Sequence, residues 1–252
     1  MKLQLVRHAT LWMVYSEHQW LIDPMFSDQG ANPPIIHSSN DKRNPLVPLP
    51  FSVHDILHPD TILLTHLHQD HWDEAAQSAL DQSLPILCQP EDEPSIRDNG
   101  FRHVTAIEDH YSCNGVTLSR TSGQHGTGEV GEWMGSVSGF VFQADNEPTV
   151  YVAGDTIWCE DVRQALDAYQ PDIIIVNAGA AQFVMGDPIT MNADDIVQVC
   201  RYAPQSKVIA VHMDTINHCH ETRTILRQKL NQEGLLDQVT IPEDGEWLVI
   251  GS

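Results

Sequence analysis

Short apolar segments recur along the whole chain, and this alternation constrains the fold more than any other feature. The first three, over 2–6, 10–15 and 19–23, are typical of an antiparallel strand meander. Later strand segments are interspersed with amphipathic helices in both halves of the chain, which favours two sheets covered by helices. We predict helices over 73–82, 160–169, 192–203 and 220–234, and further strands over 60–65, 85–89, 103–107, 116–123, 135–144, 149–155, 172–179, 206–214 and 245–251. Asp73 and Asn192 are the expected N-caps, and Gly234 the expected helix stop.

Residues 24–50 differ in character, because this stretch contains six prolines. Neither a helix nor a central strand tolerates that content. A long irregular segment inside a compact domain is usually functional or disordered. Two interpretations remain open: a surface excursion, or a flap beside an active site in which His37 reaches a substrate.

The stretch THLHQDHWD, residues 65–73, directly follows an apolar run and holds three histidines and an aspartate within six positions. In extended backbone, a spacing of two places His66 and His68 on one face, and the next turn would bring Asp70 and His71 to the same pocket. Imidazole and carboxylate are the usual ligands of zinc, manganese and iron. At this chain's histidine and aspartate content, about 0.004 chance matches are expected. The pattern therefore predicts half of a metal site rather than a histidine-rich loop.

Three later positions have the form of further ligands. His125 lies in a glycine-rich loop after a strand, and Asp155 and His212 each end an apolar strand. A lone histidine after a strand is more often hydrogen-bonded than metal-bound, and Asp155 could instead cap the next helix. Because all three follow apolar strands, they could converge on one edge of a pair of sheets.

Taken in order, these motifs resemble the metallo-β-lactamase-fold hydrolase superfamily over nearly the whole chain. The segments LIDPMFS, HGTG, AGDT and VHMD are most similar to its lactonase-like branch, which includes relatives of ascorbate-6-phosphate lactonase. The resemblance implies an α+β fold, a four-layer αββα sandwich of two mixed β-sheets with helices on the outer faces. It also implies a single metallo-hydrolase domain over residues 1–252.

The resemblance further implies a dinuclear site between the sheet edges, with two divalent metal ions per chain. Zinc is the first expectation, and manganese and iron are the alternatives. No cysteine occupies a ligand position, which argues against lactam hydrolysis, and His68 replaces an acidic residue of oxygen-reducing relatives. The implied ligands are His66, His68 and His125 for one metal, Asp70, His71 and His212 for the other, and Asp155 as the bridge.

A metal-activated hydroxide is the expected nucleophile, attacking a small ester, lactone or phosphoester. Asp70 is predicted to orient it as well as to bind metal, and His218 is the candidate donor to the leaving group. His218 and its neighbour His220 could equally be histidines of a loop before a helix. Asn177 and Asp214 are candidate substrate-binding residues, with turn formation as the alternative.

The formal net charge of −22 restricts the partners. It repels nucleic acid and anionic lipid, whereas a small phosphorylated substrate stays open because bound cations reverse the local field. We therefore predict a small-molecule substrate, no nucleic-acid or membrane partner, and homo-oligomerisation as an option, since the lactonase-like branch often self-associates. The chain has no apolar run near about 18 residues, no signal-peptide features and five cysteines without CxxC spacing. These features favour a cytoplasmic protein with reduced thiols.

Two other functions compete with a hydrolase. One is a non-catalytic metal-binding or regulatory protein on the same scaffold, against which the intact ligand set argues. The other is a nuclease of the same superfamily, against which the negative charge argues. Residues 7–10, RHAT, resemble the phosphohistidine motif of histidine phosphatases but lack its final glycine. We therefore do not expect histidine-phosphatase chemistry from this segment.

Overall fold

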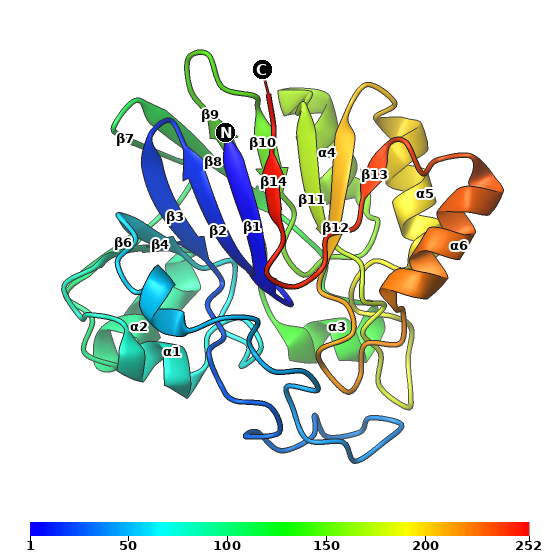
Figure 1. The fold of residues 1–252 in the computed structure, drawn as a ribbon, viewed down its shortest axis with the longest axis horizontal. Helices are drawn as coiled ribbons and strands as arrows, with labels where there is room; N and C mark the ends of the chain where they lie inside the picture. Colours follow the sequence, from blue (N-terminus) through cyan, green and yellow to red (C-terminus); the bar gives the residue numbers. More distant parts are fainter. Residues whose placement is uncertain (252) are drawn as a thin grey trace.

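The computed structural model describes residues 1–251, which form two seven-stranded β-sheets packed face to face (Figure 1). The first sheet consists of β1 (Lys2–Arg7), β2 (Thr10–Tyr15), β3 (His18–Ile22), β4 (Thr61–Leu63), β5 (Pro85–Cys88), β6 (His103–Ala106) and β14 (Trp247–Val249). The second consists of β7 (His110–Cys113), β8 (Val116–Ser122), β9 (Ser138–Gln143), β10 (Val150–Val152), β11 (Ile173–Asn177), β12 (Lys207–Val211) and β13 (Val239–Thr240).

Both sheets are mixed, and they are built in the same way. In the order β14-β1-β2-β3-β4-β5-β6, the first four strands are antiparallel and β3 to β6 are parallel. In the order β13-β12-β11-β10-β9-β8-β7, β7 to β10 are antiparallel and β10 to β13 are parallel. An α-helix lies in each connection between neighbouring parallel strands except that from β3 to β4, which contains no α-helix.

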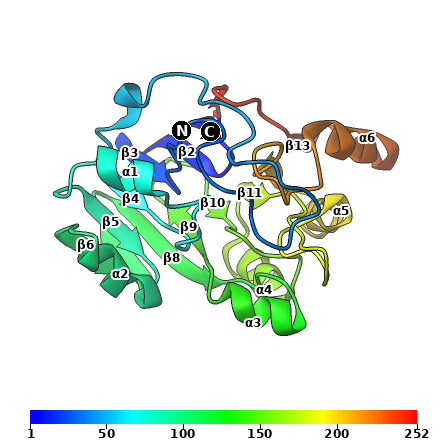
Figure 2. The ribbon, with the colours of Figure 1, turned by 90° about the horizontal axis from the view of Figure 1, so that it is seen from below.

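Helices cover the outer face of each sheet (Figure 2). The helices are α1 (Glu74–Ala79), α2 (Glu93–Asp98), α3 (Gly128–Met134), α4 (Glu160–Tyr169), α5 (Ala193–Tyr202) and α6 (Arg223–Glu233), with 3-10 turns at η1 (Val53–Ile56) and η2 (Pro90–Asp92). α1 and α2 pack on the first sheet, whereas α4, α5 and α6 pack on the second. None of the helices within residues 1–251 has the length and apolar character needed to cross a membrane.

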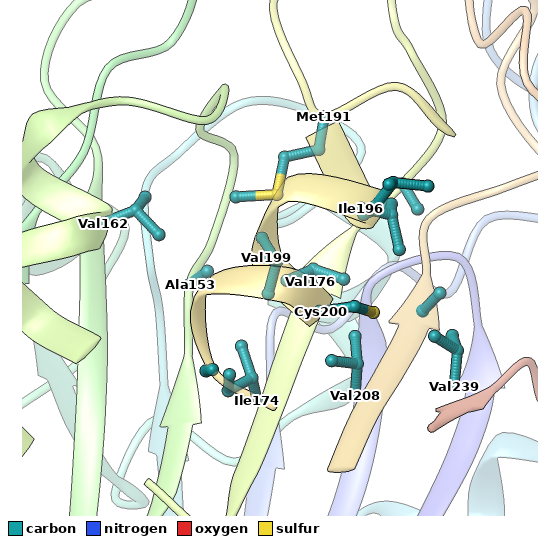
Figure 3. Packing of buried hydrophobic residues seen from close by; sticks show 14 of the residues in the cluster. Ala153, Val162, Ile174, Val176, Met191, Ile196, Val199, Cys200, Val208 and Val239 are labelled. Carbon is teal, nitrogen blue, oxygen red and sulfur yellow. The ribbon is translucent and has the colours of Figure 1, made fainter. Parts of the chain in front are cut away.

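The alternation of side chains along the central strands explains this layering. In β11, Ile173 and Ile175 point into the apolar layer between the sheets, and Ile174 and Val176 point outward to the helices. Figure 3 shows Ile174 and Val176 packed beneath Val199 of α5. A strand buried on both faces needs a continuous apolar run, which DIIIV provides. The predicted αββα sandwich is confirmed.

The longer elements agree closely with the sequence prediction. α4 spans the predicted residues 160–169, and Asn192 caps α5 through a reciprocal capping box with Asp195. α6 begins at Arg223, three residues after its predicted start, with Thr222 as its N-cap. It ends with Gly234 as its C-cap, at a φ of 71°. The prediction lacks α2, α3, β7 and β13, because these elements are short and bury few side chains.

Polar anchors hold the proline-rich segment 24–50 against the sandwich. The buried Arg7 guanidinium donates to three backbone carbonyls of the segment, and Asp73 accepts from two of its backbone amides. The Asn44 side-chain amide donates to Asn217 Oδ1 at 2.8 Å, and Asn44 Oδ1 accepts from the Asn217 backbone amide at 2.8 Å. The segment is irregular, yet its backbone is tied to both sheets.

We predict that Asp73→Ala lowers the free energy of unfolding by about 2–4 kcal/mol. The Asp73 carboxylate is 1% exposed and accepts three amide N–H groups, from Phe26, Ser27 and Ala76, at 2.7 to 3.0 Å. Alanine would leave these donors unpaired. Urea unfolding measures the change, with an unaltered m-value. The matched control is Asp98→Ala, at an exposed position, which should change stability by less than about 0.5 kcal/mol. Equal losses would contradict the assignment.

Candidate metal centre

The candidate site lies where strand ends of the two sheets meet. His66 follows β4 of the first sheet, whereas Asp155 and His212 follow β10 and β12 of the second. Gly154 makes the approach of Asp155 possible, because its φ is 70° and a Cβ there would lie 2.7 Å from the Ser138 carbonyl oxygen. His212 itself has a φ of 70°, a conformation that non-glycine residues rarely adopt.

One group of nitrogens gathers around His68. His66 Nε2 lies 3.0 Å and His125 Nε2 lies 3.3 Å from His68 Nδ1. Asp155 Oδ2 faces the same group, at 3.9 Å from His66 Nε2 and 3.6 Å from His125 Nε2. We call these three histidines the first group.

A second group lies on the other side of Asp155. His71 Nε2 and His212 Nε2 are 3.2 Å apart, and each lies 3.3 Å from Asp155 Oδ1. Asp70 Oδ2 completes this second group, at 3.4 Å from His212 Nε2 and 3.8 Å from His71 Nε2. The two oxygens of Asp155 therefore face different groups, which is the arrangement that a bridging ligand requires.

Hydrogen bonds behind the histidines determine which nitrogen faces the cluster. His71 Nδ1 donates to Asp23 Oδ2 at 2.9 Å, and His125 Nδ1 donates to the Ile189 carbonyl at 2.7 Å. The Thr65 hydroxyl donates to Asp23 at 2.7 Å and so accepts from His66 Nδ1 at 3.1 Å. In each of these rings the outer nitrogen carries the proton, which leaves the Nε2 lone pair directed inward.

Lone pairs that face one another at these distances repel unless a cation lies between them, so the donor set fits divalent metal ions. Burial and the neighbouring rings lower the pKa of His66 and His125, which keeps both imidazoles neutral. Burial opposes ionisation of Asp70 and Asp155, yet the facing imidazoles hold the pKa of each carboxyl well below its usual value. Neutral imidazole and ionised carboxylate are the forms that bind metal.

The pKa of His71 indicates that its surroundings favour positive charge. Burial alone would lower this pKa, but the carboxylates of Asp155, Asp70 and Asp23 outweigh it and raise the pKa well above its usual value. The carboxylates that favour positive charge on His71 would equally favour a bound divalent cation. A proton on His71 Nε2 would compete with that cation, so binding would be weaker at low pH.

The structure brings all seven predicted ligand residues together, but it places the other candidates differently. Asn177 donates at 2.6 Å to Asp155 Oδ1, the oxygen that faces His71 and His212, so it orients the central carboxylate. Asp214 accepts from the guanidinium and the backbone amide of Arg223 at 3.0 and 3.2 Å, where it ties down the start of α6. His220 contacts the Gln182 carbonyl at 3.3 Å at the surface.

His8 also lies in the site, although it was not among the residues predicted from the sequence. Its ring is fully buried, its Nε2 lies 3.0 Å from Asp70 Oδ2, and its centroid lies 3.6 Å from that of His212. His8 directly follows β1 and has a φ of 61°. The sequence could have identified His8, because it directly follows an apolar strand. The same criterion identified His212. Asp23 and Thr65 gave no such signal, since carboxyl and hydroxyl groups at strand ends are common.

A cavity of about 770 Å³ opens onto the cluster. Its floor is formed by His68, Asp70, His125 and Asp155, and His218 also lines it. Residues 35–37 of the proline-rich segment lie along its rim, His37 included, which favours the flap interpretation. This volume is within the range of small-molecule sites, about 300–1,000 Å³.

Comparisons with known proteins agree with this geometry. Residues 18–213 match the family described as the Beta-lactamase superfamily domain. The UPF0173 protein YddR of Bacillus subtilis is 35% identical over 250 residues, 98% of both chains. A UPF0173 metal-dependent hydrolase of Methanosphaera stadtmanae is 26% identical over 96% of both chains. The crystal structure of an isothiocyanate hydrolase from Delia radicum gut bacteria superposes with a TM-score of 0.96, at 36% identity over 100% of both chains.

The family match spans most of the chain, and the relatives extend over nearly all of it. The sandwich of two mixed sheets and the histidines at its strand ends lead to the same assignment. The chain belongs to the β-lactamase superfamily and has the metallo-β-lactamase fold.

Proposed function

We propose that the protein is a metal-dependent hydrolase of small molecules, with one divalent cation in each histidine group and zinc as the first expectation. The observation that supports a dinuclear site is the position of Asp155, whose two oxygens face separate groups. Relatives that cover nearly the whole chain are named hydrolases, which supports catalysis over a purely regulatory role. The net charge of −22 argues against a nuclease.

Two cations bound at these groups would polarise a substrate oxygen and lower the pKa of water, so that a nucleophile exists at neutral pH. The chain's own residues position the reaction. Asp70 lines the cavity with its Oδ2 held between His8 and His212, so its carboxylate can accept a hydrogen bond from the attacking water. Asn177 holds Asp155 in the orientation that serves both groups.

His218 suits a hydrogen-bond donor better than the leaving-group acid expected from the sequence. It lines the cavity at 6% exposure, and its Nδ1 has no hydrogen-bond partner among residues 1–251. Burial lowers the pKa of His218 to about 4, so the ring is neutral at pH 7. A neutral imidazole can donate a hydrogen bond to a developing oxyanion but is a poor source of a whole proton.

Esters and lactones are the first substrate candidates, and the lactonase-like branch remains a prediction. Isothiocyanates are a second candidate, because the relative at 36% identity and full coverage is named an isothiocyanate hydrolase. Hydrolysis of this group balances as R–N=C=S + H₂O → R–NH₂ + COS, with water attacking the central carbon. Both classes present an electrophilic carbon to the same nucleophile.

We expect two equivalents of divalent metal per chain when the protein is purified without chelator or affinity tag. His66→Ala and His212→Ala each remove a ligand from one group, so each should bind about one equivalent. Elemental analysis after zinc or manganese addition measures this. His103→Ala, at an exposed position on β6, is the matched control and should keep two. One equivalent of metal per chain or none in the reconstituted wild type would contradict the dinuclear site.

Asp70→Ala should lower kcat by about 10²- to 10⁴-fold, because it removes a metal ligand and the acceptor that orients water. Hydrolysis of 4-nitrophenyl acetate and of allyl isothiocyanate measures the effect. Asp98→Ala should retain wild-type rates, since that carboxylate is exposed on α2, away from the cavity. Near wild-type activity of Asp70→Ala on both substrates would refute the role given to this carboxylate.

His218→Ala should lower kcat by about 10²-fold, whereas His218→Gln should recover part of that loss because an amide N–H also donates. With a folded pKa near 4 and an ordinary value of 6.5, the ring stays neutral from pH 7 down to about pH 5. The ratio of wild-type to His218→Gln activity should therefore stay flat over that interval. A ratio that decreases as the pH is raised through about 6.5 would restore His218 as a proton donor.

A further inference from the structure

We propose that the substrate carries an uncharged, apolar group of several carbons beyond its reacting carbon, a proposal that rests on the hydrolase function given above. This group would lie against one side of the cavity, which we call the apolar wall. The apolar wall consists of Ile36, Val130, Trp133, Phe183, Val184 and Met185. It comes from the proline-rich segment, from α3 and from the loop after β11, and the first two lie at the same end of the sandwich in Figure 1.

Four side chains of the apolar wall are unusually exposed for their size. Ile36 is 75%, Met185 72%, Trp133 67% and Val184 62% exposed. Scattered exposed apolar residues are ordinary, but a group of them around one cavity marks a binding surface. The other large apolar side chains exposed among residues 1–251 do not line the cavity; they are Tyr202, Ile225, Leu236, Trp247 and Val249.

Hydrogen bonds connect the segments that carry the apolar wall to the metal centre and to each other. The Ile189 carbonyl, in the loop that carries Phe183 to Met185, accepts from His125 Nδ1 at 2.7 Å. The Val184 amide donates to the His37 carbonyl at 2.8 Å, which joins that loop to the proline-rich segment. A group bound against the apolar wall would thus have a defined position relative to the reacting carbon.

Charge decides what kind of group fits there. The residues that line the cavity include no lysine or arginine, and the charged ones are Glu129, Asp70 and Asp155. A carboxylate or phosphate distant from the metal ions would find no lysine or arginine among the lining residues to offset its loss of hydration, and Glu129 would repel it. The small polar lactone expected from the sequence resemblance fits less well than a lactone, ester or isothiocyanate with an alkyl or aryl substituent.

The first test is a chain-length series on the metal-loaded protein. With 4-nitrophenyl acetate, butyrate, hexanoate and octanoate, kcat/KM relative to spontaneous hydrolysis should rise up to about three- to fourfold for each methylene that becomes buried. The rise from acetate to hexanoate should be at least about tenfold. Trp133→Ala should flatten the series, whereas Trp247→Ala, which removes an exposed tryptophan on β14, should leave its slope unchanged. A flat series in the wild type, with turnover present, would overturn the apolar wall but retain the hydrolase.

The second test measures binding without chemistry. Calorimetry on the same metal-loaded protein should show that N-hexylacetamide binds at least about tenfold more tightly than N-[2-(2-hydroxyethoxy)ethyl]acetamide, a polar chain of equal length. Trp133→Ala should remove the difference. If no ester or isothiocyanate is turned over but this preference holds, the proposed function fails and the apolar wall stands. Equal affinity of the two amides would overturn the apolar wall. One further result would overturn the apolar wall. In it, N-hexylacetamide does not bind, and sedimentation shows that the wild type is a dimer whereas Trp133→Ala is a monomer.

Discussion

The buried carboxylate of Asp23 organises both histidine groups at once. Its Oδ2 accepts from His71 Nδ1 and from the Thr65 hydroxyl, and its Oδ1 accepts from the Thr65 amide. Through Thr65 it also orients His66, so one carboxylate directs a ring in each group. Asp23 is 2% exposed, and a buried anion that lacked these donors would be strongly unfavourable. The same hydrogen bonds therefore satisfy the carboxylate and aim the imidazoles.

Much of the architecture was accessible from the sequence because it depends on local patterns. The continuous apolar run DIIIV predicts a strand buried on both faces, and Asn192 predicts the start of α5 as its N-cap. The HxHxDH spacing identifies four candidate ligands because neighbouring positions in extended backbone and a turn are close in space whatever the rest of the fold does. The short elements α3 and β13 were missed, since few of their side chains are buried and tertiary contacts decide their conformation.

The remaining features of the site depend on contacts between distant segments. His8 lies 62 positions from Asp70, and no local pattern reports that their side chains are 3.0 Å apart. Asn177 was predicted to bind substrate but bonds to Asp155 instead, because the last residue of β11 points toward the neighbouring strand end. The solvent exposure of a side chain is likewise not predictable from the sequence alone. Trp133 and Met185 look like core residues until the fold places them beside an open cavity.

The candidate ligands come from both sheets: His66 to His71 follow β4 of the first, and His125, Asp155 and His212 follow strands of the second. A cation held between them would therefore also cross-link the two halves of the sandwich. By mass action, an ion that binds only the folded chain stabilises it in proportion to the logarithm of the ion's concentration. The persistence of the folded protein, and not only its turnover, would then follow the free metal concentration around it.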